Sequence, residues 1–129
     1  METQLEASLP AVPVSVRDAR ETVGEIAAKA GASDRAIEDV RLCVSEAVAN
    51  VVRHAYREHG DVSIMVEREG EELTVVVRDD GVGLGGFQRE GDLGYGLRII
   101  DELTRRCAIS SMPDMGTEVR MVFALDEPA

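Results

Sequence analysis

The order of helical and extended patterns limits this chain to few folds. Residues 15–29 and 33–57 repeat apolar side chains at helical intervals, and Ser33 is suited to cap the second helix. Two segments with alternating apolar residues follow, joined by EGEE, a composition typical of a hairpin turn. The remaining segments are a strand at 3–9, a helix at 95–105, and strands at 107–112 and 117–125. This order predicts an α+β two-layer sandwich, with helices on one face of a mainly antiparallel mixed sheet.

Composition narrows the classes of function. The chain has 129 residues and 44% apolar content, which fits one domain over residues 1–129. Its net charge of −11 disfavours direct nucleic-acid binding, because counterion release needs a basic surface. The acidic surface suits either a basic protein partner or simple solubility. We find no signal peptide and no apolar run of membrane-spanning length, so we expect a cytoplasmic protein with no membrane contact.

Cys43 and Cys107 are not spaced like zinc or redox motifs. Their apolar neighbours predict two buried thiols in a reducing compartment.

The second helix carries polar residues beside its apolar stripe. Glu46, Asn50 and then Arg53 or His54 recur at intervals of three or four residues, so they share one strip. Glu46 is a candidate general base, and the Asn50 carboxamide oxygen is a candidate ligand for Mg²⁺. The alternative is an ordinary solvated helix edge, and the E-x-x-x-N pattern alone does not decide between them.

A glycine-rich segment connects a strand to a helix. Seven of the twelve glycines lie between Gly81 and Gly96. Asp79 ends the preceding strand and can accept hydrogen bonds, for instance from an exocyclic amine. Gly94 opens the following helix, whose free N–H groups suit a phosphate chain. The alternative is a flexible surface loop.

Neither of the two classical phosphate motifs is present in the sequence. Neither G-x-x-x-x-G-K-[ST] nor a dinucleotide fingerprint occurs. Gly116-Thr117, before the last strand, has by itself the composition of an ordinary turn followed by a strand.

Taken in order, these features resemble the GHKL (Bergerat-fold) superfamily of ATP-binding domains. Residues 45–56 look like its N-box, 79–83 like its D-x-G-x-G box, 94–97 like its second glycine box, and 116–117 like its last box. The S-E-A-x-x-N form and the short length make the chain similar to bacterial anti-sigma-factor serine kinases. The resemblance covers about residues 10–125 of the chain.

The resemblance implies a role for each matched position. Asn50 would hold Mg²⁺ against the phosphates of ATP, Asp79 would accept from the adenine amino group, and Glu46 would deprotonate a serine hydroxyl. The remaining positions would line the adenine pocket (Gly81, Gly83 and Thr117) or cradle the phosphates below a lid at 84–93 (Gly94, Gly96 and Leu97).

The resemblance also implies partners. Such proteins sequester a sigma factor, phosphorylate a serine on a STAS-domain antagonist and commonly form a homodimer. One departure concerns the lid, where the family usually places an arginine just before the second glycine box. Here Gly91-Asp92-Leu93 takes that place, with Arg89 or Arg98 as substitutes. The alternative function is therefore a nucleotide-dependent binding switch without efficient kinase activity.

Overall fold

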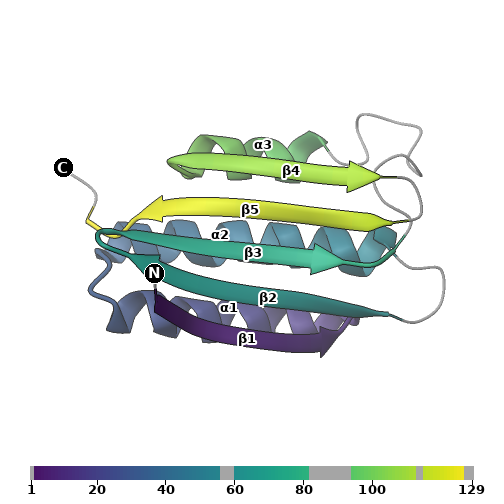
Figure 1. The fold of residues 1–129 in the computed structure, drawn as a ribbon, viewed down its shortest axis with the longest axis horizontal. Coiled ribbons are helices and arrows are strands. Elements are labelled where there is room, and N and C mark those ends of the chain that lie inside the picture. The colour runs from purple at the N-terminus through teal and green to yellow at the C-terminus, as the bar shows by residue number, and fades with distance from the viewer. Residues whose placement is uncertain (1, 56–59, 82–93, 113–114, 127–129) are drawn as a thin grey trace.

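The structure is a computed structural model that describes residues 2–55, 60–81, 94–112 and 115–126. It has two layers, with the helices gathered behind one face of a five-stranded sheet (Figure 1). The bounds of the elements are β1 Glu2–Pro10, α1 Pro13–Lys29, α2 Asp34–Asn50, a π-helical turn η1 Val51–Ala55, β2 Asp61–Glu69, β3 Glu72–Asp79, α3 Gly94–Leu103, β4 Arg106–Met112 and β5 Gly116–Ala124. The predicted α+β sandwich is confirmed.

The strand order is β1-β2-β3-β5-β4, and β5 is inserted between β3 and β4. All four pairings among the described strands are antiparallel, so the described sheet lacks the parallel pair that a mixed sheet would contain. Asp79 pairs with Thr117, and Thr117 pairs with Ser111. These three residues therefore form one row across the ends of β3, β5 and β4.

The core lies between the helices and the sheet, as the two periodicities predict. Val62, Ile64 and Val66 of β2 are almost wholly buried, and every second residue of β3 from Leu73 to Val77 joins them. The apolar stripe of α2 is buried against this sheet face. At the start of α2 the backbone N–H of Ala36 donates to Ser33 Oγ at 3.1 Å, which confirms the predicted cap.

The second helix differs from the predicted continuous α-helix. The α-helical part ends at Asn50, and η1 continues it as a π-helical turn. A π-turn accommodates an extra residue per turn, which the spacing of apolar residues does not encode. The predicted end near residue 57 lies outside the described residues.

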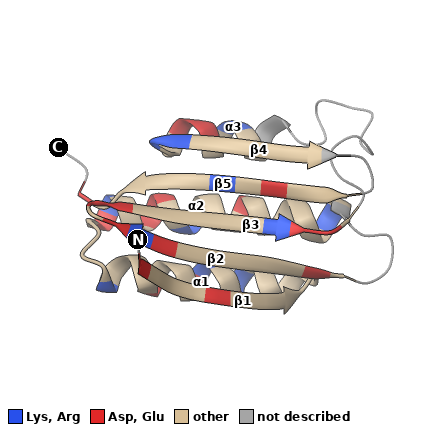
Figure 2. Cartoon of the chain, viewed as in Figure 1, with Lys and Arg blue, Asp and Glu red and all other residues tan. Residues whose placement is uncertain are grey.

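Charged residues occur on several strands of the sheet as well as on the helices (Figure 2). Within the described ranges, no helix is long and apolar enough to cross a membrane. Both cysteines are free; Cys43 is buried as predicted, whereas Cys107 is only half-buried because β4 is the last strand of the sheet.

Candidate functional site

The ends of β3 and β5 form one wall of the candidate site. Asp79 is only 6% exposed as a residue, and the Gly81 N–H donates to its Oδ1 at 2.8 Å. Burial raises the pKa of Asp79 above its ordinary value, and hydrogen bonds from the backbone of Gly81 and Thr117 partly offset that rise. The Thr117 and Ser111 hydroxyls lie 3.1 Å apart. Asp79 is thus a buried acceptor beside two hydroxyl groups that can donate or accept.

A small hollow opens at this wall. Its volume is about 200 Å³, and Asp79, Ser111 and Thr117 line it together with Arg78 and Glu118, so it also reaches the face of the sheet turned away from the helices. Ser111 was not predicted from the sequence, because only the register of β4 against β5 brings it to Thr117.

Gly116 allows β3 and β5 to approach closely at this wall. Its φ of 86° lies in the left-handed region that favours glycine. A Cβ atom built there would lie 2.0 Å from the Asp79 carbonyl oxygen. The sequence indicated an ordinary turn at this position. In the structure, the pairing of Asp79 with Thr117 requires a glycine here.

The second wall forms where α2 meets the first turn of α3. Gly96 is buried, and a Cβ atom built on it would lie 2.8 Å from Glu46 Oε2 and 3.6 Å from Asn50 Nδ2. The two polar side chains of α2 therefore face the backbone of α3 at a glycine. This contact explains why Glu46 and Asn50 border the apolar stripe: they contact a second helix there.

Asn50 has a further partner in the π-helical turn. Arg53 Nη2 donates to Asn50 Oδ1 at 3.3 Å. The sequence placed Arg53 or His54 on the same strip as Asn50, and the structure brings the Arg53 guanidinium to the carboxamide oxygen.

Figure 1 places the two walls at the same end of the molecule. The C-terminal ends of α2 and β3 lie there with the start of α3 and the start of β5. Gly94 is the first residue of α3. The Leu97 side chain packs against the core, so the backbone of Leu97 is the part that a ligand can contact. Gly83, the lid at 84–93 and the triplet 91–93 lie outside the described residues.

The chemistry of the two walls fits a nucleotide with Mg²⁺. In the described part of the chain, no three His, Cys, Asp or Glu side chains gather into a metal site. A single amide oxygen from the protein is compatible with Mg²⁺, since this ion takes few protein ligands and completes its shell with phosphates and water. A buried carboxylate with two backbone donors still has lone pairs for the amino group of a base.

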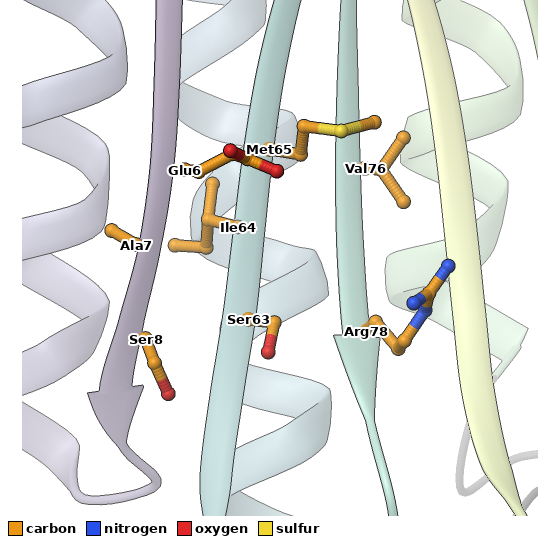
Figure 3. Close-up of a pocket in the computed structure, with 8 residues that line it drawn as sticks. All are labelled: Glu6, Ala7, Ser8, Ser63, Ile64, Met65, Val76 and Arg78. Atoms are coloured by element: carbon orange, nitrogen blue, oxygen red, sulfur yellow. The ribbon is translucent and has the colours of Figure 1, made fainter.

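A separate hollow lies on the open face of the sheet (Figure 3). Its volume is about 430 Å³, and its lining comes from β1, β2 and β3. Arg78 at one side is already ion-paired with Glu118, and Glu6 lies at the other side. This face is opposite to Glu46 and Asn50, so the hollow is not part of the candidate site.

Known proteins share this organisation. Residues 9–123 match the histidine kinase-like ATPase domain family. Serine-protein kinase RsbW of Bacillus subtilis is 38% identical over 92 residues, which are 70% of this chain and 58% of that protein. The matched part thus spans less than two thirds of that relative.

Two further similarities cover almost the whole chain. The anti-sigma F factor of Clostridium acetobutylicum is 30% identical over 141 aligned residues, covering 98% of this chain and 99% of that protein. The crystal structure of the RsbU and RsbW domains of a Mycobacterium tuberculosis protein superposes with a TM-score of 0.76 at 23% identity. That superposition covers 97% of this chain and 32% of the other, and it supports the fold.

Proposed function

Because this chain belongs to the histidine kinase-like ATPase domain family, we propose that it binds ATP with Mg²⁺ and phosphorylates a serine of a partner protein. The observation that carries the proposal is the contact of α2 with α3 at Gly96. It places a carboxylate and a carboxamide at the N-terminal turn of a helix, where phosphates bind well.

The β3–β5 wall is proposed to recognise adenine. Asp79 accepts a hydrogen bond from the exocyclic amino group, and Thr117 contacts the base directly or through water. Gly81 and Gly83 line the pocket beside them. Support comes from the burial of Asp79, since a buried carboxylate gains most from a donor that water does not compete with.

The helical wall is proposed to hold the phosphates. The backbone N–H groups at Gly94, Gly96 and Leu97 are at the positive end of α3, and Asn50 Oδ1 is the protein ligand of Mg²⁺. When bound, ATP supplies the phosphoryl group and Mg²⁺ neutralises charge on its phosphate oxygens.

Glu46 is proposed as the general base. Its carboxylate would take the proton of the acceptor serine hydroxyl. The serine oxygen would then form a bond to the terminal phosphorus of ATP as the bond from that phosphorus to the bridging oxygen breaks, and ADP would leave. Gly96 supports this role, because the absence of a side chain leaves room for the carboxylate beside the first turn of α3.

The relatives' names support a proposal about partners. One relative is an anti-sigma F factor and others are serine-protein kinases. We propose that this chain sequesters a sigma factor in the cytoplasm, phosphorylates a STAS-domain antagonist and acts as a homodimer. The second candidate is a nucleotide-dependent binding switch without efficient transfer. Gly91-Asp92-Leu93 favours it, because this triplet replaces the expected arginine with an aspartate that would repel a phosphate.

The test compares Glu46→Gln with Glu38→Gln, a matched change at an exposed position of α2. Glu46→Gln is expected to keep ATP affinity within about threefold and to lower transfer to a STAS protein by about 100-fold or more, the usual contribution of a general base. Glu38→Gln is expected to change neither. Wild-type protein that binds ATP but transfers to no STAS protein supports the switch, and unchanged transfer in Glu46→Gln rules out the base assignment.

A further inference from the structure

We propose that Ser111 is a positioning residue of the adenine pocket, which turns the hydroxyl proton of Thr117 toward the base when a nucleotide binds. This inference rests on the proposed function, because Ser111 acts through a residue assigned to the base. The hydroxyl oxygens of Ser111 and Thr117 lie 3.1 Å apart, within hydrogen-bond distance. The register of β4 against β5 pairs the two residues and fixes this contact.

The sheet keeps Ser111 away from the amino group of the base. Asp79, Thr117 and Ser111 lie in one row on three successive strands, β3, β5 and β4. Neighbouring strands are about 4.8 Å apart, so Ser111 is about 10 Å from Asp79 across the sheet. A base whose amino group meets Asp79 therefore reaches Thr117, on the next strand, before it reaches Ser111. Ser111 acts on the base through Thr117.

The two hydroxyl groups can arrange their protons in two ways, because each group has one proton. In the first arrangement Ser111 donates to the Gly116 carbonyl oxygen, 3.4 Å away, and Thr117 donates to Ser111. Both protons are then used within the protein, and Thr117 offers a ligand only lone pairs. In the second arrangement Ser111 donates to Thr117, and the Thr117 proton is available to a ligand.

Adenine requires the second arrangement. Its amino group is next to the ring nitrogen N1, which only accepts hydrogen bonds. When Asp79 accepts from the amino group, the neighbouring protein group must donate to N1, directly or through one water. Thr117 can donate and keep its hydrogen bond to Ser111 only when Ser111 is the donor of that bond. The two bonds then form a chain from Ser111 through Thr117 to the base, in which each bond polarises the next.

The contact of Ser111 with Gly116 lets this exchange occur without a movement of the backbone. The Gly116 carbonyl accepts the Ser111 proton before a nucleotide binds, and rotation of the hydroxyl group brings that proton to Thr117. The contact given up is the longer of the two, 3.4 Å against 3.1 Å, so its loss costs little.

The test measures nucleotide affinity by calorimetry with Mg²⁺, with no need for turnover. ADP is compared with 1-deaza-ADP, in which a C–H group replaces N1. Ser111→Ala is expected to bind ADP about fivefold more weakly than wild type, the worth of one neutral hydrogen bond, and to bind 1-deaza-ADP within about twofold of wild type. A purely structural role of Ser111 would weaken the binding of both nucleotides equally.

Three further variants complete the design. Ser110→Ala removes an exposed hydroxyl from the opposite face of β4, and it is expected to change neither affinity. Thr117→Val removes the hydroxyl through which Ser111 acts, so the addition of Ser111→Ala to this variant is expected to cause no further loss of ADP affinity. Ser111→Thr keeps the hydroxyl, and it is expected to bind ADP within about twofold of wild type.

The outcomes separate this inference from the proposed function. Wild-type protein that binds no ADP overturns both. Wild-type protein that binds ADP, with equal losses for ADP and 1-deaza-ADP in Ser111→Ala, overturns the role of Ser111 alone. A loss that persists when Ser111→Ala is added to Thr117→Val also overturns it, because Ser111 then acts without Thr117. Ser111→Thr protein as weak as Ser111→Ala overturns it as well, because the hydroxyl is then not the group that matters.

Discussion

Gly116→Ala is expected to destabilise the protein by about 2–5 kcal/mol, and the structure divides this cost into two parts. The first is backbone strain, because φ at this position is 86° and an L-residue pays about 1–2 kcal/mol in the left-handed region. The second is a collision: the new Cβ would lie 2.0 Å from the carbonyl oxygen of Asp79 and 2.9 Å from Cα of Asp80. Both contacts are to backbone, so relief requires β3 and β5 to move apart. Such overpacking costs about 1–3 kcal/mol.

Gly31→Ala is the matched control for this experiment. Gly31 has a φ of 91°, close to that of Gly116, but a Cβ atom built there has no neighbour within 4 Å. Gly31→Ala therefore carries the strain without the collision, and we expect a loss of about 1–2 kcal/mol. The difference in unfolding free energy between the two variants therefore measures the cost of the collision between β5 and β3.

Urea unfolding followed by circular dichroism measures both free energies, and an unchanged m-value shows that the unfolded states are comparable. ADP affinity gives a second readout, because separation of the strands displaces Asp79 in Gly116→Ala and leaves the site untouched in Gly31→Ala. Equal destabilisation of the two variants would refute the reasoning, since the collision would then cost nothing.

Three further predictions test other parts of the structure. Gly96→Ala is expected to keep the unfolding free energy within about 1 kcal/mol, because a helix favours alanine and the one close contact of the new Cβ, at 2.8 Å, is to the movable tip of Glu46. Phosphoryl transfer is expected to fall about tenfold or more, and an unchanged rate would contradict the importance of this contact. Burial raises the pKa of Cys43 to about 12. A thiol reagent at neutral pH is therefore expected to label Cys107 first, and to label Cys43 only as urea unfolds the chain. Rapid labelling of the native Cys107→Ser variant would contradict this expectation. Hydrogen bonds from Arg106 and Arg105 lower the pKa of Glu72 from 4.5 to about 2. The ionised carboxylate therefore stabilises the fold fully above pH 4.5, and this contribution disappears as the pH falls toward 2. The Tm difference between wild type and Glu72→Gln is expected to shrink over that pH interval, and a constant difference would contradict the assignment.

Local periodicity predicted the elements and their buried faces because both depend on neighbours in sequence. Val62 to Val66 and Leu73 to Val77 alternate, and the short turn between them fixes their register. The residue that departs from the alternation is Val76, which points away from the helices yet is only 3% exposed. It lies in the middle strand of the sheet, where Met65 and Arg120 are its partners on the two neighbouring strands and long side chains shield small ones.

The site itself depends on contacts that periodicity does not encode. Asp79 and Thr117 pair across β3 and β5, although a helix and another strand separate them in sequence. The residue pattern therefore indicated two separate features, and only the resemblance to a family joined them in one site. Ser111 stayed unrecognised because it belongs to no motif and reaches Thr117 through register alone.

Gly116 and Gly96 each leave space for a neighbouring group, but the group is backbone at Gly116 and a side chain at Gly96. The first glycine is therefore needed for the fold, whereas the second is not. At Gly116 the neighbour is the backbone of β3, which cannot yield without loss of strand pairing. At Gly96 the neighbour is the end of a side chain, which turns aside while the helices remain packed. Selection on stability alone would therefore preserve Gly116 and tolerate alanine at Gly96. A glycine at position 96 is better explained by the role proposed for the Glu46 carboxylate than by any need of the fold.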